Sequence, residues 1–315
     1  MDKQPNRRAE TPSIFTYRDA IEQGLSPGAM RSAAFDAPTR GLRRLAGEDV
    51  GVLELFGAYT RLDPGTFLSH ISSALAWGIW LPASISVLFP IHLTRIKGAG
   101  GHSRRPDVVG HVAPLLERDV RTAGGLALTS PAWTWADLAG TGMRLEDLVA
   151  AGDSLLQTPE GPPRPDGVLG VHPLSNVEEI AEVLSRRKSV PGVRLAREVL
   201  PLLRPGVYSA PESRLRSMLV EEGIHDLEVN VRLHFPDGWS VMPDLVIRRA
   251  RIAIQYDGDH HRLDRNQYES DINRDAMLRE RGWTVIKVTR TVFSREGRAK
   301  FLARLRRELL LAAVA

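Results

Sequence analysis

The chain has 315 residues, a formal net charge of +4 and 43% hydrophobic residues, which is the composition of a globular protein of about two or three domains. It contains no cysteine, so disulfide bonds and thiolate metal sites are excluded. The polar N-terminus lacks the apolar segment of a secretory signal, and we expect a cytoplasmic protein.

Residues 64 to 94 contain no Lys, Arg, Asp or Glu, a feature that raises the question of a membrane helix. Pro82 and Pro90 interrupt this stretch. A spanning helix needs about 20 predominantly apolar residues without such breaks. We therefore expect a buried core segment here and no membrane partner.

The N-terminal region is predicted to be a tail followed by a small helical unit. Residues 1 to 12 are polar and are expected to be disordered, and the unit covers residues 13 to 61. Residues 16 to 23 read as a short helix, with Thr16 as N-cap and Asp19 at the capping-box position.

A second helix is predicted over residues 28 to 35, because Ser26 and Pro27 form a typical helix start. The basic segment 38 to 45 follows it. Helix, glycine turn, helix and basic hairpin is the order of a winged helix-turn-helix. The alternative is a small helical hairpin with a solvated charged face. In the winged-helix interpretation, residues near a DNA groove are Met30, Arg31 and Ser32, and residues near phosphates are Arg40, Arg43 and Arg44.

Residues 62 to 156 are predicted to form a middle α/β unit. Helical spacing occurs over residues 67 to 77 and 134 to 155, and residues 85 to 93 read as a strand. The histidines of this unit lack ligand-like spacing, so we expect ordinary core or surface residues at His70, His92, His102 and His111.

The same region resembles the middle region of proteins related to the AbiEi antitoxin. The resemblance rests on Ser69-His70 followed by the segment 74 to 78, and on the segments 129 to 139 and 147 to 153. Including the N-terminal unit, it covers roughly residues 13 to 156. Such antitoxins resemble DNA-binding repressors, so the resemblance implies DNA as a partner, with a toxin or other protein as a second candidate partner.

Residues 157 to 206 are predicted to connect the middle unit to the C-terminal domain. Residues 157 to 174 are rich in Pro and Gly and form the best linker candidate. Ser175 is the expected cap of an amphipathic helix that ends near residue 187, and residues 192 to 203 read as another helix.

The C-terminal domain is predicted over residues 207 to 315. A helix starts at Ser209-Ala-Pro211-Glu212, and strands, helices and a last basic helix follow it. The expected strands cover residues 229 to 235, 245 to 247, 252 to 254 and 283 to 288, and the later helices cover residues 269 to 281 and 298 to 311. This order predicts an α/β (α+β) fold with a mixed sheet flanked by helices.

Oxygen donors are expected to converge at one end of that sheet. Asp244 opens one strand, and Gln255 and Asp257 share a face near the end of the next. A hairpin between the strands would place Gln255 close to Asp244. Hard cations such as Mg²⁺ prefer such ligands. Gly258 could then turn the next residues back over the site, and these are Asp259, His260 and His261.

The motif Pro243-Asp244, ten residues, then Gln255-x-Asp257 resembles the PD-(D/E)xK nuclease core. The segments 212 to 219, 271 to 278 and 282 to 289 extend the resemblance to the branch similar to very-short-patch-repair endonucleases, over roughly residues 207 to 310. The family carries an acid where this chain has Gln255, which offers a neutral oxygen.

The resemblance implies a Mg²⁺- or Mn²⁺-dependent DNA endonuclease. Asp244, Gln255, the Tyr256 carbonyl and Asp257 would be metal ligands, with Glu212 nearby. His260 or His261 would transfer a proton. The basic segment 279 to 307, with ten Lys or Arg against two acidic residues, suits DNA. Candidate phosphate contacts are Arg274, Arg279, Arg281 and Lys287. The alternative function is a non-catalytic DNA-binding regulator that retains the nuclease fold.

Overall fold

The computed structural model describes residues 13 to 258 and 265 to 314, with side chains except those of residues 265 to 272. The predicted tail and the residues Asp259, His260 and His261 lie outside this description. The chain forms two compact units, the first composed of Met1–Gly142, Arg164–Val171 and Glu182–Val193, and the second of Met143–Pro163, His172–Ala181 and Arg194–Ala315. No described helix combines the length and apolar character that crossing a bilayer requires.

The division into units differs from the predicted domain boundaries. The helix α5 (Leu145–Leu155) belongs to the second unit, whereas the sequence places it in the middle unit. The predicted linker 157 to 174 has no helix or strand, but part of it is packed. Leu169 is 8% exposed, and its N–H donates to the Ala76 carbonyl at 2.8 Å.

The elements of the first unit are α1 (Tyr17–Glu22), α2 (Val52–Leu62), α3 (His70–Trp77), α4 (Pro131–Leu138), β1 (Ile14–Thr16), β2 (Phe35–Asp36), β3 (Leu42–Leu45), β4 (Thr66–Leu68), β5 (Ile91–Ile96), β6 (Val108–Ala113), β7 (Val120–Ala123) and β8 (Leu126–Thr129). The strand orders are β1-β3-β2 in a small sheet and β6-β5-β4-β8-β7 in a larger one. Sequence periodicity placed the strand of β5 too early. It begins at Ile91 because Pro90 cannot donate a ladder hydrogen bond.

The N-terminal sheet agrees only partly with the winged-helix prediction. The capping box of Thr16 and Asp19 is present at the start of α1, and the basic segment forms the β2–β3 hairpin. The predicted helix over residues 28 to 35 is wrong, because this segment makes only a single 3-10 turn over Ala29–Arg31. Met30 is 1% exposed and packs with Phe15, so it is a core residue rather than a groove contact.

Helices α6 (Val177–Arg186) and α7 (Val193–Val199) each have residues in both units. The Asn176 side chain accepts from the Glu179 N–H at 2.8 Å, so Asn176 caps α6 in place of the predicted Ser175. The predicted helical stretch 134 to 155 is divided between α4 and α5, with Gly142 at a φ of +81° between them.

The other elements of the second unit are α8 (Ala210–Glu221), α9 (Arg265–Glu280), α10 (Arg295–Val314), β9 (Glu228–Val229), β10 (Leu233–His234), β11 (Ser240–Val241), β12 (Leu245–Ile247), β13 (Ile252–Tyr256) and β14 (Thr284–Val288). The main sheet has the order β14-β13-β12-β9, with β13 and β14 parallel and the other pairs antiparallel. The predicted mixed sheet is therefore present. The strand predicted over residues 229 to 235 is broken at Asn230, whose φ is +49°, and its two parts pair in different sheets.

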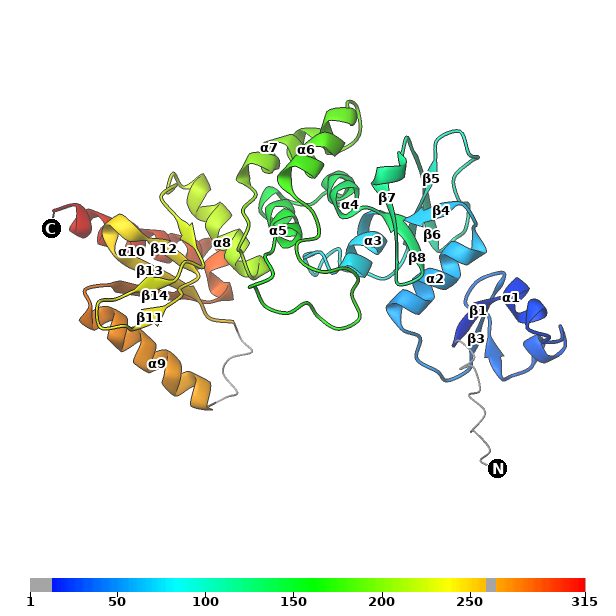
Figure 1. Cartoon of the computed structure of the whole chain (residues 1–315), viewed down its shortest axis with the longest axis horizontal. Coiled ribbons are helices and arrows are strands. Elements are labelled where there is room, and N and C mark those ends of the chain that lie inside the picture. The colour runs from blue at the N-terminus through cyan, green and yellow to red at the C-terminus, as the bar shows by residue number, and fades with distance from the viewer. Residues whose placement is uncertain (1–12, 259–264, 315) are drawn as a thin grey trace. The chain divides into compact units, whose positions relative to one another are not determined.

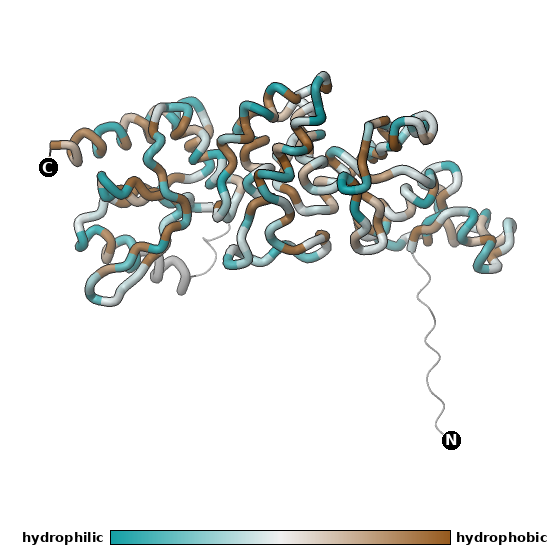
Figure 2. Tube along the Cα trace, turned by 45° about the horizontal axis from the view of Figure 1, so that its top comes forward, coloured by the Kyte–Doolittle hydropathy of each residue, from teal (hydrophilic) through white to brown (hydrophobic). Residues whose placement is uncertain are grey.

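Helices cover both faces of this sheet (Figure 1). One face packs on α8 and α10, and its core includes Leu219, Ile254 and Leu302. The other face packs on α9 and on the β10–β11 hairpin, through Val246 and Leu278. Brown, hydrophobic stretches run through this sheet in Figure 2, while α10 alternates between brown and teal. The alternation of side chains along β12 and β13 supplies both cores and fixes the register of the sheet.

Candidate active site

The β12–β13 hairpin brings Asp244 beside Gln255. Leu245 pairs with Ile254, and the register places the residue before Leu245 opposite the residue after Ile254. The Tyr256 N–H donates to Asp244 Oδ2 at 2.6 Å, which holds the carboxylate against the end of β13. The juxtaposition predicted from the strand pattern is therefore present.

Glu212 reaches the same place from the first turn of α8. Its Oε1 accepts from Ser209 Oγ at 2.7 Å, and its Oε2 accepts from the Tyr208 N–H at 3.1 Å. The Ser209 hydroxyl in turn accepts from the Glu212 N–H at 3.4 Å, as expected of an N-cap. Glu212 is 8% exposed, so these contacts place a carboxylate inside the protein.

Asn230 connects the two carboxylate-bearing segments. Its N–H donates to the Asp244 carbonyl at 3.0 Å, and its Nδ2 donates to Glu212 Oε2 at 2.8 Å. A residue other than glycine with positive φ is uncommon, and asparagine tolerates it better than most. The interruption of the predicted strand therefore serves to aim the Asn230 side chain at Glu212.

Burial and a neighbouring carboxylate dominate the electrostatics of Asp244. Burial raises its pKa to about 7, and the charge of Glu212 adds to the rise. The hydrogen bond from Tyr256 and the charge of Arg274 lower it by less. Ionising both carboxylates is costly in this setting. A divalent cation between them would remove that cost, so the donor set fits Mg²⁺ or Mn²⁺.

Gln255 is 7% exposed and lies in β13 between Asp244 and β14, where its ladder partner is Lys287. The Asp257 N–H donates to the Val288 carbonyl at 2.7 Å, which carries the parallel pairing one residue beyond β13. The predicted ligands Asp244, Gln255, Tyr256 and Asp257 thus occupy one end of the hairpin.

Asp275 joins this end of the sheet and was missed by the sequence analysis. It lies on α9, is 5% exposed, and its Oδ2 is 2.7 Å from Lys287 Nζ. Arg279 is 3.8 Å from the same oxygen and is largely exposed. The sequence signal for the contact between Asp275 and Arg279 is their spacing of four residues, which places the two side chains on the same face of a helix. Lys287, a predicted phosphate contact, forms an ion pair with Asp275 next to Gln255.

The N-terminal arginines divide into two groups. Arg31 and Arg40 are exposed. Arg43 donates to the Met30 carbonyl at 3.0 Å and the Leu42 carbonyl at 2.7 Å, and Arg44 is 2.8 Å from Asp36. The first pair is available to an external phosphate. In the second pair, Arg43 links β3 to the 3-10 turn at Met30, and Arg44 links β3 to β2.

Three histidines of the first unit, which were predicted to be ordinary core or surface residues, converge. The nitrogens of His70, His92 and His111 lie within 4.8 Å of one another. They come from α3, β5 and β6, so their spacing in sequence carries no recognisable ligand pattern. Only the pairing of β5 with β6, in which His92 is opposite Val109, brings two of them together.

Among known proteins, two uncharacterized proteins of Mycobacterium tuberculosis, from strains CDC 1551 / Oshkosh and H37Rv, are similar to this chain. Each is 26% identical over 209 residues, which are 66% of this chain and 71% of the relative. No protein-family model matches the chain.

Proposed function

We propose that the protein is a Mg²⁺- or Mn²⁺-dependent DNA endonuclease whose active site is the end of the β12–β13 hairpin. The observation that carries the proposal is the approach of Glu212 to Asp244 at that end, where burial and mutual repulsion raise the pKa of Asp244 to about 7. The two carboxylates bring negative charge and oxygen donors together, and such a set suits a hard cation.

Asp244 and Glu212 would hold the metal, with the Gln255 side-chain oxygen, the Tyr256 carbonyl and Asp257 as further donors. The metal would acidify a bound water and stabilise charge on the scissile phosphate. The hydrogen bond from Tyr256 N–H fixes one Asp244 oxygen and leaves the other to face the site. His260 and His261 remain the proposed proton-transfer residues.

The flanking cations suit a polyanionic substrate. Arg279 is 56% exposed on α9, and Arg274 acts electrostatically on Asp244 from the same helix. These two arginines would contact phosphates on either side of the cleaved bond. The mixed sheet between α8, α10 and α9 agrees with the mixed sheet flanked by helices that was expected from the sequence, and this agreement supports the proposal.

The test is a plasmid-nicking assay with Mg²⁺ or Mn²⁺. Wild type should nick DNA, and Asp244→Ala should lose activity by about 100-fold or more, since the anchoring carboxylate is gone. Asp226→Ala removes an exposed carboxylate of the same unit and should leave activity unchanged. Equal activity of wild type and Asp244→Ala would remove this site from the reaction.

The second candidate is a non-catalytic DNA-binding regulator, and Gln255 is the observation that favours it. A neutral oxygen at this position lowers the negative charge available to a cation. The variant Gln255→Glu separates the candidates. Cleavage that occurs only in Gln255→Glu, with DNA binding by wild type at a specific site, identifies the natural protein as a regulator. A toxin protein would then be the partner to seek.

A further inference from the structure

His70, His92 and His111 occupy a position in the first unit where three different elements meet. His70 is the first residue of α3, His92 lies in β5, and His111 lies in the neighbouring strand β6. The rings of His70 and His111 stack with centroids 3.8 Å apart, and both rings are nearly parallel to that of His92. The three imidazoles are thus held together by packing from both the helix and the sheet.

The nitrogen positions fit a single metal ion. His92 Nδ1 is 3.0 Å from His111 Nε2, and a nitrogen of His70 lies within 4.8 Å of both. Two imidazole nitrogens on one tetrahedral Zn²⁺ are about 3.3 Å apart, since each Zn–N bond is about 2.0 Å. The rings are now nearly parallel, so metal binding would require them to turn about their Cβ–Cγ bonds until three nitrogen lone pairs converge on the ion.

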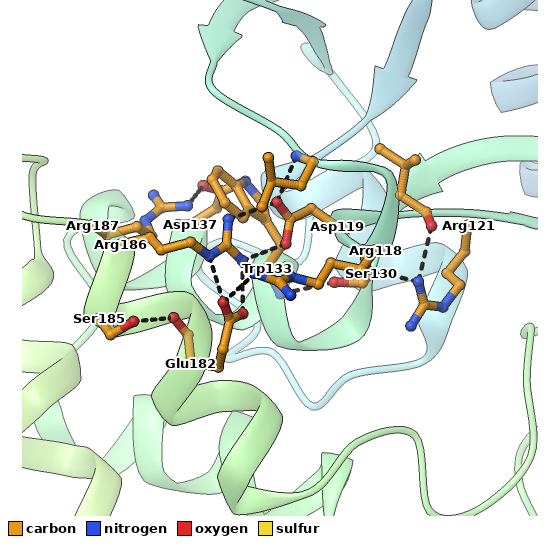
Figure 3. Close-up of polar contacts among 12 residues, drawn as sticks. Arg118, Asp119, Arg121, Ser130, Trp133, Asp137, Glu182, Ser185, Arg186 and Arg187 are labelled. Atoms are coloured by element: carbon orange, nitrogen blue, oxygen red, sulfur yellow. Dashed lines mark hydrogen bonds and ion pairs between the residues drawn. The ribbon is translucent and has the colours of Figure 1, made fainter.

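A carboxylate stands behind His70. Asp137 Oδ2 is 3.4 Å from His70 Nδ1, and Asp137 is 4% exposed. Arg187 Nη1 is 2.7 Å from the other Asp137 oxygen. Figure 3 shows this ion pair next to the Trp133 side chain. The nearer partner of His70 Nδ1 is Ser69 Oγ, at 3.1 Å. A carboxylate close to the second nitrogen of a ligating histidine is a recurrent feature of metal sites.

The backbone of His70 also suits a functional role. His70 adopts a φ of +49°, a strained backbone conformation that is found more often at functional positions than elsewhere.

We propose that His70, His92 and His111 bind one Zn²⁺ ion, with Asp137 orienting His70 from the second sphere. Imidazole nitrogens suit zinc and similar transition metals rather than Mg²⁺, so this site is distinct in chemistry from the carboxylates of the second unit. Three protein ligands leave a fourth position for water or a small ligand. The proposal does not depend on the nuclease assignment.

The test is zinc binding by the full chain carrying Asp244→Ala, which removes the carboxylate site. Equilibrium dialysis against Zn²⁺ should give one bound ion per chain, and Co²⁺ should give visible absorption bands typical of tetrahedral nitrogen ligation. Adding His111→Ala should abolish both signals. Adding His102→Ala, which changes an exposed histidine of the same region, should change neither.

A thermal unfolding scan guards against misfolded variants. Zn²⁺ should raise the unfolding temperature of the Asp244→Ala protein and of its His102→Ala derivative, but not that of the His111→Ala derivative. Absence of zinc binding by the folded Asp244→Ala protein overturns the proposal, and the three rings are then a hydrogen-bonded stack. Binding that survives His111→Ala overturns it as well.

Discussion

The substitution Asp244→Asn should stabilise the metal-free protein, and more so at high pH. Asparagine has the shape of the aspartate and can still accept from the Tyr256 N–H, but it carries no charge beside Glu212. A carboxyl whose pKa is raised on folding binds more protons folded than unfolded. Stability therefore falls as pH rises from the unfolded value of 3.8 to the folded value of about 7.

The size of the effect follows from the two pKa values of Asp244. Between these two pKa values, each rise of one pH unit lowers the unfolding free energy of the wild type by about 1.4 kcal/mol. Relative to Asp244→Asn, the wild type should lose about 2 kcal/mol of unfolding free energy between pH 5 and pH 7. Above about pH 8 the difference should stay constant, since Asp244 is then ionised in both states.

The assay is chemical unfolding of both proteins at pH 5, 6, 7 and 8 without divalent metal. Mg²⁺ added at pH 8 should stabilise the wild type and leave Asp244→Asn unchanged. Asp226→Asn, an exposed carboxylate of the same unit, should follow the wild type throughout. A stability difference that does not vary with pH would refute the reasoning, as would an equal response of both proteins to Mg²⁺.

Two further predictions concern the folds of the two units. Arg216→Ala should cost about 3–5 kcal/mol of unfolding free energy, because it leaves the fully buried Asp153 without its ion-pair partner at 2.9 Å; Arg248→Ala breaks an exposed pair and should cost under about 1 kcal/mol by the same unfolding assay. Gly192→Ala and Gly206→Ala both place alanine at positive φ, and for this reason each should lose about 1–2 kcal/mol of unfolding free energy. Gly192→Ala should lower the melting temperature more than Gly206→Ala, because a Cβ at Gly192 would meet the backbone that follows α4 whereas a Cβ at Gly206 would enter open space. Equal melting temperatures of the two variants would contradict this prediction.

Two short apolar runs on either side of a basic turn were enough to predict the hairpin that carries Asp244 and Gln255. The observed pairing of Leu245 with Ile254 sets these two polar residues opposite each other. The position of Glu212 was accessible too, because Ser209 and Pro211 mark a helix start with the acid in its first turn.

The histidine cluster could not be predicted in this way. His70, His92 and His111 are brought together by the pairing of β5 with β6 and by the start of α3, contacts that no local pattern specifies. The prediction of a second N-terminal helix over residues 28 to 35 failed for a related reason. Phe35 pairs with Leu45 in the small sheet, and this tertiary pairing overrides the local helix signals.

The most direct test of the central claim is the binding of Mn²⁺, followed by the electron paramagnetic resonance signal of the free ion. The protein used should carry His111→Ala, so that the carboxylates of the second unit are the site under test. We predict that this protein removes one equivalent of Mn²⁺ from solution and that adding Glu212→Gln and Asp244→Asn abolishes the uptake. Equal uptake with and without the two carboxylates would contradict the account.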